Sequence, residues 1–469
     1  MFSKKNIFTV LIFLLCSQRT FSQAEKQVIY TPEAFIQQIA QYHPIAKQAD
    51  ILVDKARAEL LSAKGGFDPN VNVDASRKTF DGKNYYFYTN PELRIPTPIG
   101  IDIRTGLENN GGDFLNTDIT RGRSSYLGLE IPLAKGLLMD RRRAVLQQAK
   151  IFQSQSEQER LAVLNDLLFD AYTDYWKWAG AYQLYGIYTK FLVIATDRLR
   201  LVRIAYTNGD RAMIDTVEAF TQVQNYQLQQ SEALLKLNNS KFDLSNYLWL
   251  TDENPYQLPT QFVPDTVQFA RTVIARPLDE IIEQSAMENP IIKSYEFQLN
   301  SLEVERKLKF QNLLPTVNLK ANLLNRDYYA LNGFNTAFLQ NNYRWGFEFK
   351  IPVFLRESRG DYLKTKLIIK ETDLELANRR WQIENKILSY YNENNLLKQQ
   401  LQTTQGIYYN YYSLLRNEEL KFNQGESSLF LINTRETKVL EVLQKQIDLR
   451  IMYFKSKFAT EWAAGILRF

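Results

Sequence analysis

The side chains that most often carry catalysis or bind metals are nearly absent from this chain. Its 469 residues include one histidine, His43, and one cysteine, Cys16. Most metal sites need several such groups, and a single cysteine cannot build a disulfide framework. The carboxylates are scattered along helical segments, and no GxSxG, HExxH or phosphate-binding glycine loop occurs. We therefore predict no enzyme activity, no metal site and no cofactor.

The first 22 residues have the pattern of a secretory signal peptide. Lys4 and Lys5 precede an apolar run from Ile7 to Leu15, and cleavage is predicted after Ser22. The run is too short to span a bilayer, which needs roughly 20 residues. Cleavage also removes Cys16, although a lipidated Cys16 stays open as an alternative. Three of the 57 basic residues leave with the peptide, so 54 basic and 52 acidic residues remain. A net charge of +2 gives no reason to expect a nucleic acid partner.

An internal repeat organises the rest of the chain. The segment that begins at His43 matches the segment that begins at Asn289 without gaps, and Pro44 falls on Pro290. Further on, EIPL matches KIPV and YTNGD matches FNQGE. Four prolines lie in the stretch between the two copies, which is typical of a linker. The predicted boundaries are 23–250 for the first repeat, 251–277 for the linker and 278–469 for the second repeat.

Each repeat is predicted to contain a helix, a strand region, a very long helix, a glycine turn and a returning helix, so the fold is mainly α with β. Apolar residues in the long helices recur at alternating spacings of three and four, which indicates a coiled-coil seam. At 1.5 Å per residue, each long helix reaches on the order of 100 Å. The predicted helix pairs are 32–63 and 278–311, 139–206 and 361–422, and 211–249 and 427–465.

Short alternating segments predict strands between the first and second helices. Val71, Val73 and Ala75 alternate with polar residues, as do their counterparts after Pro315. The second strand of each copy ends at an Ile-Pro step, which suits proline because it has no N–H to donate. This gives four strands per chain. In the enlarged region 73–131, the segment YYFYTNPELRIPTPIGIDIRTGL can form one or two extra strand segments. We favour one longer hairpin with an external loop at the NNGG segment, 109–112, over a change in barrel size.

Four strands are too few to close a barrel, which needs about eight. An open sheet edge is not tolerated in lipid, because its backbone groups would lack partners. The mean hydropathy of −0.35 argues against a polytopic helical membrane protein, yet alternating strands never form long apolar runs. A secreted chain of this kind is therefore expected to oligomerise, and three copies would supply about twelve strands.

In this order of elements and motifs the chain resembles the TolC-like family of outer membrane efflux proteins. The resemblance covers roughly residues 30–467 and rests on the paired HP/NP, PNVNV/PTVNL, EIPL/KIPVF and tip segments. It implies a homotrimer in outer membrane lipid, with a twelve-stranded β-barrel continuing into a periplasmic α-helical coiled-coil barrel. It also implies a passive channel that meets a periplasmic adaptor (membrane fusion) protein and an inner-membrane transporter, in efflux or type I secretion.

The two glycine turns are the candidate adaptor contacts. Gly209 and Gly425 permit the left-handed backbone that reverses a helix. The resemblance places the adaptor at these tips, although a purely solvated face or a purely structural turn is the alternative. The candidate contact residues are Arg203, Gly209, Asp210, Arg211, Gly425, Glu426 and Ser427.

The periplasmic gate departs from the family pattern. The resemblance implies two aspartates six and nine residues after the second tip glycine, but Leu431 and Thr434 stand there. Leu431 with Phe430 would form an apolar constriction, which gates by excluding water.

Two other functions remain for comparison. A structural periplasmic coiled-coil protein without channel activity predicts no strands, and a secreted enzyme predicts a catalytic constellation. The exported substrate is left undetermined.

Overall fold

The computed structural model describes residues 27–251, 253–272, 276–328 and 341–469. The signal peptide predicted over residues 1–22, with Cys16, lies outside these ranges. The chain divides into two compact units. One consists of residues up to Lys47, Val163–Ser285 and Glu384–Phe469, and the other of Gln48–Ala162 and Ala286–Ile383. Each unit takes segments from both predicted repeats.

The described residues are mostly helical, as predicted. The long helices and the helices that return from them lie within a few residues of the expected bounds. Among the described residues, no helix is long and apolar enough to cross a membrane. The helices are α2 (Pro32–Tyr42), α3 (Pro44–Lys64), the 3₁₀ turn η1 (Gly65–Phe67), α4 (Arg141–Thr207), α5 (Met213–Ser245), α6 (Thr266–Ala270), α7 (Leu278–Glu288), α8 (Pro290–Gln311), α9 (Arg356–Asn423) and α10 (Leu429–Ala464).

The first predicted helix of each repeat is in fact two helices, broken just before a proline. Proline disfavours helical backbone in the residue before it, so α2 ends at Tyr42 and α7 ends at Glu288. The residue before each proline caps the next helix. His43 Nδ1 accepts the N–H of Ile45 at 3.2 Å. Asn289 Oδ1 accepts the N–H of Ile291 at 3.0 Å. The two matched positions therefore share one local role.

Aromatic side chains build the core of the unit that contains α5 and α10. Tyr175, Trp176 and Trp178 of α4 are at most 1% exposed. Trp176 stacks on Phe454 of α10 with 3.8 Å between ring centroids. The polar Asn394, an interruption in the seam of α9, is buried and donates to the Tyr453 carbonyl at 2.9 Å. These contacts show that the aromatic residues of α4 serve packing against α10.

Segment 251–277, predicted as a linker, also contributes regular structure to this unit. Its residues include β6 (Phe262–Pro264) and α6. β6 pairs in parallel with β1 (Val28–Tyr30) in a two-stranded sheet. Tyr175 of the core donates its hydroxyl to the Tyr30 carbonyl at 2.7 Å, which ties β1 to α4.

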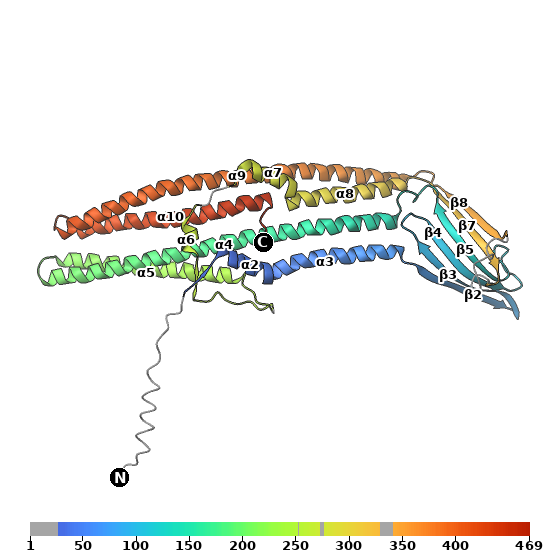
Figure 1. The fold of residues 1–469 in the computed structure, drawn as a ribbon, viewed down its shortest axis with the longest axis horizontal. Helices are drawn as coiled ribbons and strands as arrows, with labels where there is room; N and C mark the ends of the chain where they lie inside the picture. Colours follow the sequence, from blue (N-terminus) through green and yellow to red (C-terminus); the bar gives the residue numbers. More distant parts are fainter. Residues whose placement is uncertain (1–26, 252, 273–275, 329–340) are drawn as a thin grey trace, which may run out of the picture. The chain divides into compact units, whose positions relative to one another are not determined.

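The other unit contains a six-stranded antiparallel sheet in the order β2-β3-β4-β5-β7-β8. Figure 1 shows these strands side by side, with β2 and β8 at its two edges. The presence of the sheet opposes a purely coiled-coil protein. The strands are β2 (Asn70–Phe80), β3 (Lys83–Pro96), β4 (Asp102–Gly111), β5 (Gly122–Pro132), β7 (Thr316–Arg326) and β8 (Tyr343–Lys350).

The prediction of four strands per chain is therefore wrong, and the total of about twelve strands in three chains no longer follows. Region 73–131 does not form one longer hairpin with an external loop. It folds into β2, β3, β4 and β5, and the expected NNGG loop falls largely within β4. Asn110 in that segment is 2% exposed, and its side chain donates to the Thr120 carbonyl at 3.1 Å.

Alternation along the strands gives the sheet one apolar and one charged face. The register continues each face across the sheet, because Leu319 of β7 lies opposite both Ile131 of β5 and Phe347 of β8. The apolar face includes Val71, Val73, Leu93, Ile95, Ile103, Leu127, Leu129, Ile131, Val317, Leu319, Trp345, Phe347 and Phe349. The opposite face carries Glu92, Arg94, Asp102, Arg104, Glu130 and Lys320.

Candidate functional site

The two predicted tips are helix-to-helix turns of the same geometry. Gly209 joins α4 to α5 and Gly425 joins α9 to α10, and both have φ of 82°. In each turn the glycine N–H donates to the carbonyl three residues earlier, and the next N–H donates to the carbonyl five residues earlier. These distances are 3.0 and 2.9 Å in the first turn and 3.1 and 2.9 Å in the second. The bonds satisfy the last carbonyls of α4 and α9, as a Schellman cap does.

The two arginines of the first tip lie over aromatic rings. The guanidinium of Arg211 is 4.3 Å from the ring centroid of Phe422, which belongs to the second tip. Arg211 also lies 4.0 Å from the Asp215 carboxylate. Arg203 is exposed, with its guanidinium 5.9 Å from the Phe220 ring. Arg211 therefore connects the two hairpins, while Arg203 stays on its own hairpin with its charge in solvent.

The remaining tip residues divide between solvent and local bonds. Asp210 and Glu426 are exposed. The Ser427 hydroxyl donates to Glu418 at 2.5 Å, so this side chain is engaged within α9 and the turn. Asp210 and Glu426 are thus the two tip carboxylates that a partner protein can reach.

The three predicted gate residues share an exposed surface at the start of α10. Phe430 is 65% exposed and Leu431 is 39% exposed. Thr434 is exposed and donates its hydroxyl to the Phe430 carbonyl at 2.8 Å. Their buried neighbours Leu429 and Ile432 anchor the helix on its other side. The surface that these residues present is predominantly apolar.

A buried charge network lies directly behind the tips and joins α4, α5 and α10. Arg198 makes two hydrogen bonds to the Glu436 carboxylate, one of them at 2.9 Å. The Tyr226 hydroxyl donates to the same carboxylate at 3.0 Å. The Glu436 side chain is 2% exposed and that of Arg198 is 13% exposed. Asn433 adds a link by donating to Glu218 of α5 at 3.0 Å.

The network shifts the pKa of Arg198 and of Tyr226. Burial lowers the pKa of Arg198, but the hydrogen bonds and charge of Glu436 outweigh it, so that the pKa is raised. Burial first, and then the charge of Glu436, raises the pKa of Tyr226. Arg198 is therefore held as a cation and Tyr226 as a neutral donor. The predictions from sequence missed this network, because its members lie among many similar charges on long helices.

A second network covers the charged face of the sheet. Arg104 of β4 donates to both carboxylate oxygens of Glu92 on β3, at distances down to 2.6 Å, and to Glu130 of β5 at 3.3 Å. Tyr126 donates its hydroxyl to Glu92 at 2.5 Å. Lys320 of β7 lies 3.6 Å from Glu130. The network therefore connects four neighbouring strands on one face.

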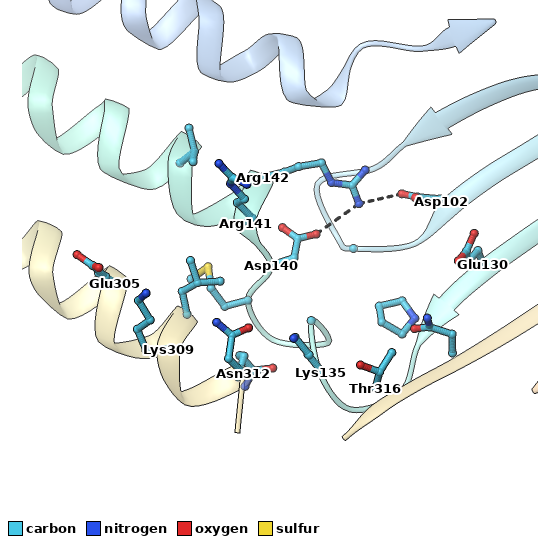
Figure 2. Close-up of a pocket in the computed structure, with 18 of the residues that line it drawn as sticks. Asp102, Glu130, Lys135, Asp140, Arg141, Arg142, Glu305, Lys309, Asn312 and Thr316 are labelled. Carbon is cyan, nitrogen blue, oxygen red and sulfur yellow. Dashed lines mark hydrogen bonds and ion pairs between the residues drawn. The ribbon is translucent and has the colours of Figure 1, made fainter. Parts of the chain in front are cut away.

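The network continues to the start of α4. Arg94 donates to Asp102 at 2.5 Å, and Asp102 also accepts from Arg142 of α4 at 3.0 Å. Figure 2 shows Arg142 between Asp102 and Asp140, its two partners. These residues line a cavity of about 710 Å³, to which Lys309 of α8 also contributes. The ion pairs fix β4 to α4, and charges of both signs line the cavity.

The sheet network was also absent from the predicted sites. A signal for it exists in the sequence, because Glu92 and Arg94 alternate with Leu93 and Ile95. The same alternation follows Asp102, and it indicates strands with one charged face. Among the described residues, no three histidine, cysteine, aspartate or glutamate side chains are grouped so that they could hold a metal ion.

Comparisons with known proteins agree with this fold. Residues 35–248 match the family model described as outer membrane efflux protein. A search of curated proteins found no match. The Campylobacter jejuni CmeC outer membrane channel is 16% identical, with a TM-score of 0.64 over 92% of this chain and 85% of that chain. The open state of the Neisseria gonorrhoeae MtrE outer membrane channel is 14% identical, with a TM-score of 0.64 over 92% and 88%. The Vibrio cholerae outer membrane protein VceC is 13% identical, with a TM-score of 0.62 over 92% and 96%.

Proposed function

Because the chain is TolC-like in fold and carries the outer membrane efflux protein pattern over residues 35–248, we propose that it is the outer membrane channel of a tripartite efflux or type I secretion system. It acts as a passive exit duct, and an inner-membrane transporter supplies the energy and selects the cargo. Three copies assemble in the outer membrane, with the helices in the periplasm. The observation that carries this proposal is the sheet with one apolar and one charged face.

Lipid contact follows from the exposure of the apolar face. In β8, Trp345, Phe347 and Phe349 are each more than half exposed, which is costly in water. Their neighbours Arg344 and Glu348 point to the other face. The apolar face therefore suits lipid, and the charged face suits a water-filled lumen.

Membrane insertion tests this assignment. A lysine on the lipid face of a barrel costs about 2–4 kcal/mol near the midplane, whereas lumen positions tolerate charge. Phe347→Lys should therefore reduce the amount of protein in the outer membrane, and Glu348→Lys, on the same strand, should not. The unmodified chain should form long-lived channels in planar lipid bilayers. The absence of channels from well-folded protein would refute the proposed function.

The tips dock onto a periplasmic adaptor protein. Asp210 and Glu426 support this role, because both carboxylates are exposed beside the two glycine turns. Glu426→Cys should form crosslinks to cysteines at the adaptor tip in cells that contain the whole pump. Glu232→Cys is the matched control, since Glu232 is exposed on α5 well away from the turn. If both variants crosslink equally, or neither does, the tips are not the docking site.

The start of α10 forms the periplasmic gate. Phe430, Leu431 and Thr434 supply an exposed, predominantly apolar surface close to the second tip. Three such surfaces brought together in a trimer form a constriction that hinders conduction by excluding water. Asp215 and Glu218 stand six and nine residues after Gly209, the spacing of an acidic gate in the first repeat. They are less suited to such a gate, because Asp215 faces Arg211 and Glu218 accepts from Asn433.

A further inference from the structure

Two strands of the six-stranded sheet have an unpaired edge among the described residues. β2 and β8 are the outermost strands, and nearly every residue in them is exposed on both faces. In lipid, the N–H and C=O groups along these edges need partners. Six strands are too few to close a barrel by themselves, since about eight are required. The partner strands must therefore come from another chain.

The two edges are complementary, so that a second copy of this chain fits both. β2 follows α3 and leads away from the helices, whereas β8 leads back to α9. Placed side by side, β8 of one copy and β2 of the next are antiparallel. Both alternate apolar and polar side chains, and both polar faces carry charges of both signs, with Asp74 and Lys78 on β2 and Arg344, Glu348 and Lys350 on β8.

The β3–β4 hairpin has the geometry of an insertion into a complete β2–β5 hairpin. Asp81 and Gly82, with φ of 51° and 70°, form a two-residue turn after β2. If residues 83–121 were removed, this turn would place Phe80 opposite Gly122 and Asn70 opposite Pro132. Those four residues are the ends of the two strands. The polar faces of the two strands would also coincide, because Asn72 would lie opposite Glu130.

We propose that β3 and β4 are inserted into the barrel wall, and that three copies joined β8 to β2 close a barrel of about eighteen strands, six from each chain. This inference rests on the proposed function. Barrel diameter grows roughly linearly with strand number, so the barrel is about 1.5 times as wide as one of twelve strands. The inserted strands also place Glu92, Arg94, Asp102 and Arg104 on the lumen wall, where their ion pairs brace it.

Cysteine crosslinking tests the joint between copies. Asp74→Cys on β2 is combined with a cysteine at each polar-face position of β8 in turn, namely Arg344, Gly346, Glu348 and Lys350. At least one pair should give covalent dimers and trimers under oxidation. Glu108→Cys is the control, because β4 lies inside the sheet between β3 and β5. Crosslinks from Glu108 instead of Asp74, or no crosslink from Asp74 with any β8 position, would overturn the proposal.

A deletion variant tests the size of the barrel. Removal of residues 83–121 should leave the β2–β8 crosslink intact and reduce the barrel diameter by about one third, as measured by electron cryomicroscopy in lipid nanodiscs. An unchanged diameter would overturn the proposal. If the variant does not fold, the diameter and crosslinks of the full chain decide. If the full chain forms channels but Asp74→Cys gives no crosslink, this inference alone is refuted. If the full chain neither inserts into the membrane nor conducts, the proposed function is refuted as well.

Discussion

Removal of the charge at Glu436 should loosen the helices behind the tips. Glu436→Gln keeps the shape of the side chain and can still accept from Tyr226, but it removes the carboxylate that pairs with the buried guanidinium of Arg198 and leaves only the weaker charge interaction with Glu419. Arg198 is only 13% exposed, so solvent compensates little of this loss. Breaking a buried pair by removing one partner costs about 3–5 kcal/mol. The lower end of this range is expected here, because the amide retains part of the hydrogen bonding.

The assay is hydrogen exchange of the α10 amides near Glu436 in the purified channel. Where local opening is fast, exchange follows the free energy of opening, and about 3 kcal/mol corresponds to more than a 100-fold increase in rate. Asp197→Asn is the matched control on α4. Its partner Arg200 lies 3.8 Å away, and both side chains are more than 60% exposed. Such a surface pair contributes less than about 1 kcal/mol, so little change is expected.

The double variant Arg198→Met with Glu436→Leu separates the missing charge from general damage. Replacement of a buried ion pair by apolar residues of similar volume is often neutral or stabilising. Exchange should then return to within about tenfold of the original rate, although Tyr226 loses an acceptor. The reasoning is refuted if Glu436→Gln changes exchange no more than Asp197→Asn does. It is also refuted if the double variant is less protected than the single one.

Three further predictions concern the cap, the turn and the gate. Burial lowers the pKa of His43, so the folded protein favours the neutral imidazole. The stability that neutral His43 contributes is fully present above the ordinary histidine pKa of about 6.5, and it is lost as the pH falls through the lowered pKa of the folded state. His43→Asn should reduce the loss of Tm between pH 7.5 and pH 5, and equal losses would contradict this reasoning. Gly425→Ala should cost about 1–2 kcal/mol of local stability, because the backbone at this position has φ of 82°, which alanine adopts only at a cost. Gly406→Ala, inside α9, should stabilise the helix. Equal hydrogen-exchange rates of the neighbouring amides in the two variants would show that the turn does not require glycine. Leu431→Ser should increase single-channel conductance in planar bilayers, and an unchanged conductance would remove Leu431 from the gate.

The helices were predictable because their signals are local. α4 was expected over 139–206 and occupies Arg141–Thr207, since a long stretch without proline and a seam of regular spacing define it. The turns at Gly209 and Gly425 were predictable for the same reason, because a reversal of the chain requires a residue that tolerates positive φ. The break before Pro44 was missed, although proline itself supplies the physical reason.

The buried network behind the tips could not be predicted, because it depends on which faces of three helices meet. Arg198 and Glu436 are 238 residues apart and belong to different predicted repeats. Many other arginines and glutamates on the same helices are exposed. The spacing of the seam identifies the buried apolar positions, but it does not predict which of the charged residues beside the seam form buried ion pairs. That choice is made by tertiary packing.

A local rule conflicts with the tertiary structure at Pro91, which lies inside the region 73–131 where the strand count was wrong. Proline has no N–H for a ladder, so its presence argues against an interior strand. β3 is nevertheless an interior strand, and the pairing between β3 and β4 is interrupted at this point. Pro91 pairs with Val73 of β2, while neither Asn90 nor Pro91 has a partner in the β3–β4 register. The Asn90 side chain accepts the N–H of Asn109 at 3.4 Å, in place of a backbone carbonyl. A neighbouring asparagine thus lets the proline lie inside the sheet, so an isolated proline excludes an interior strand only when no adjacent side chain can replace the lost ladder bond.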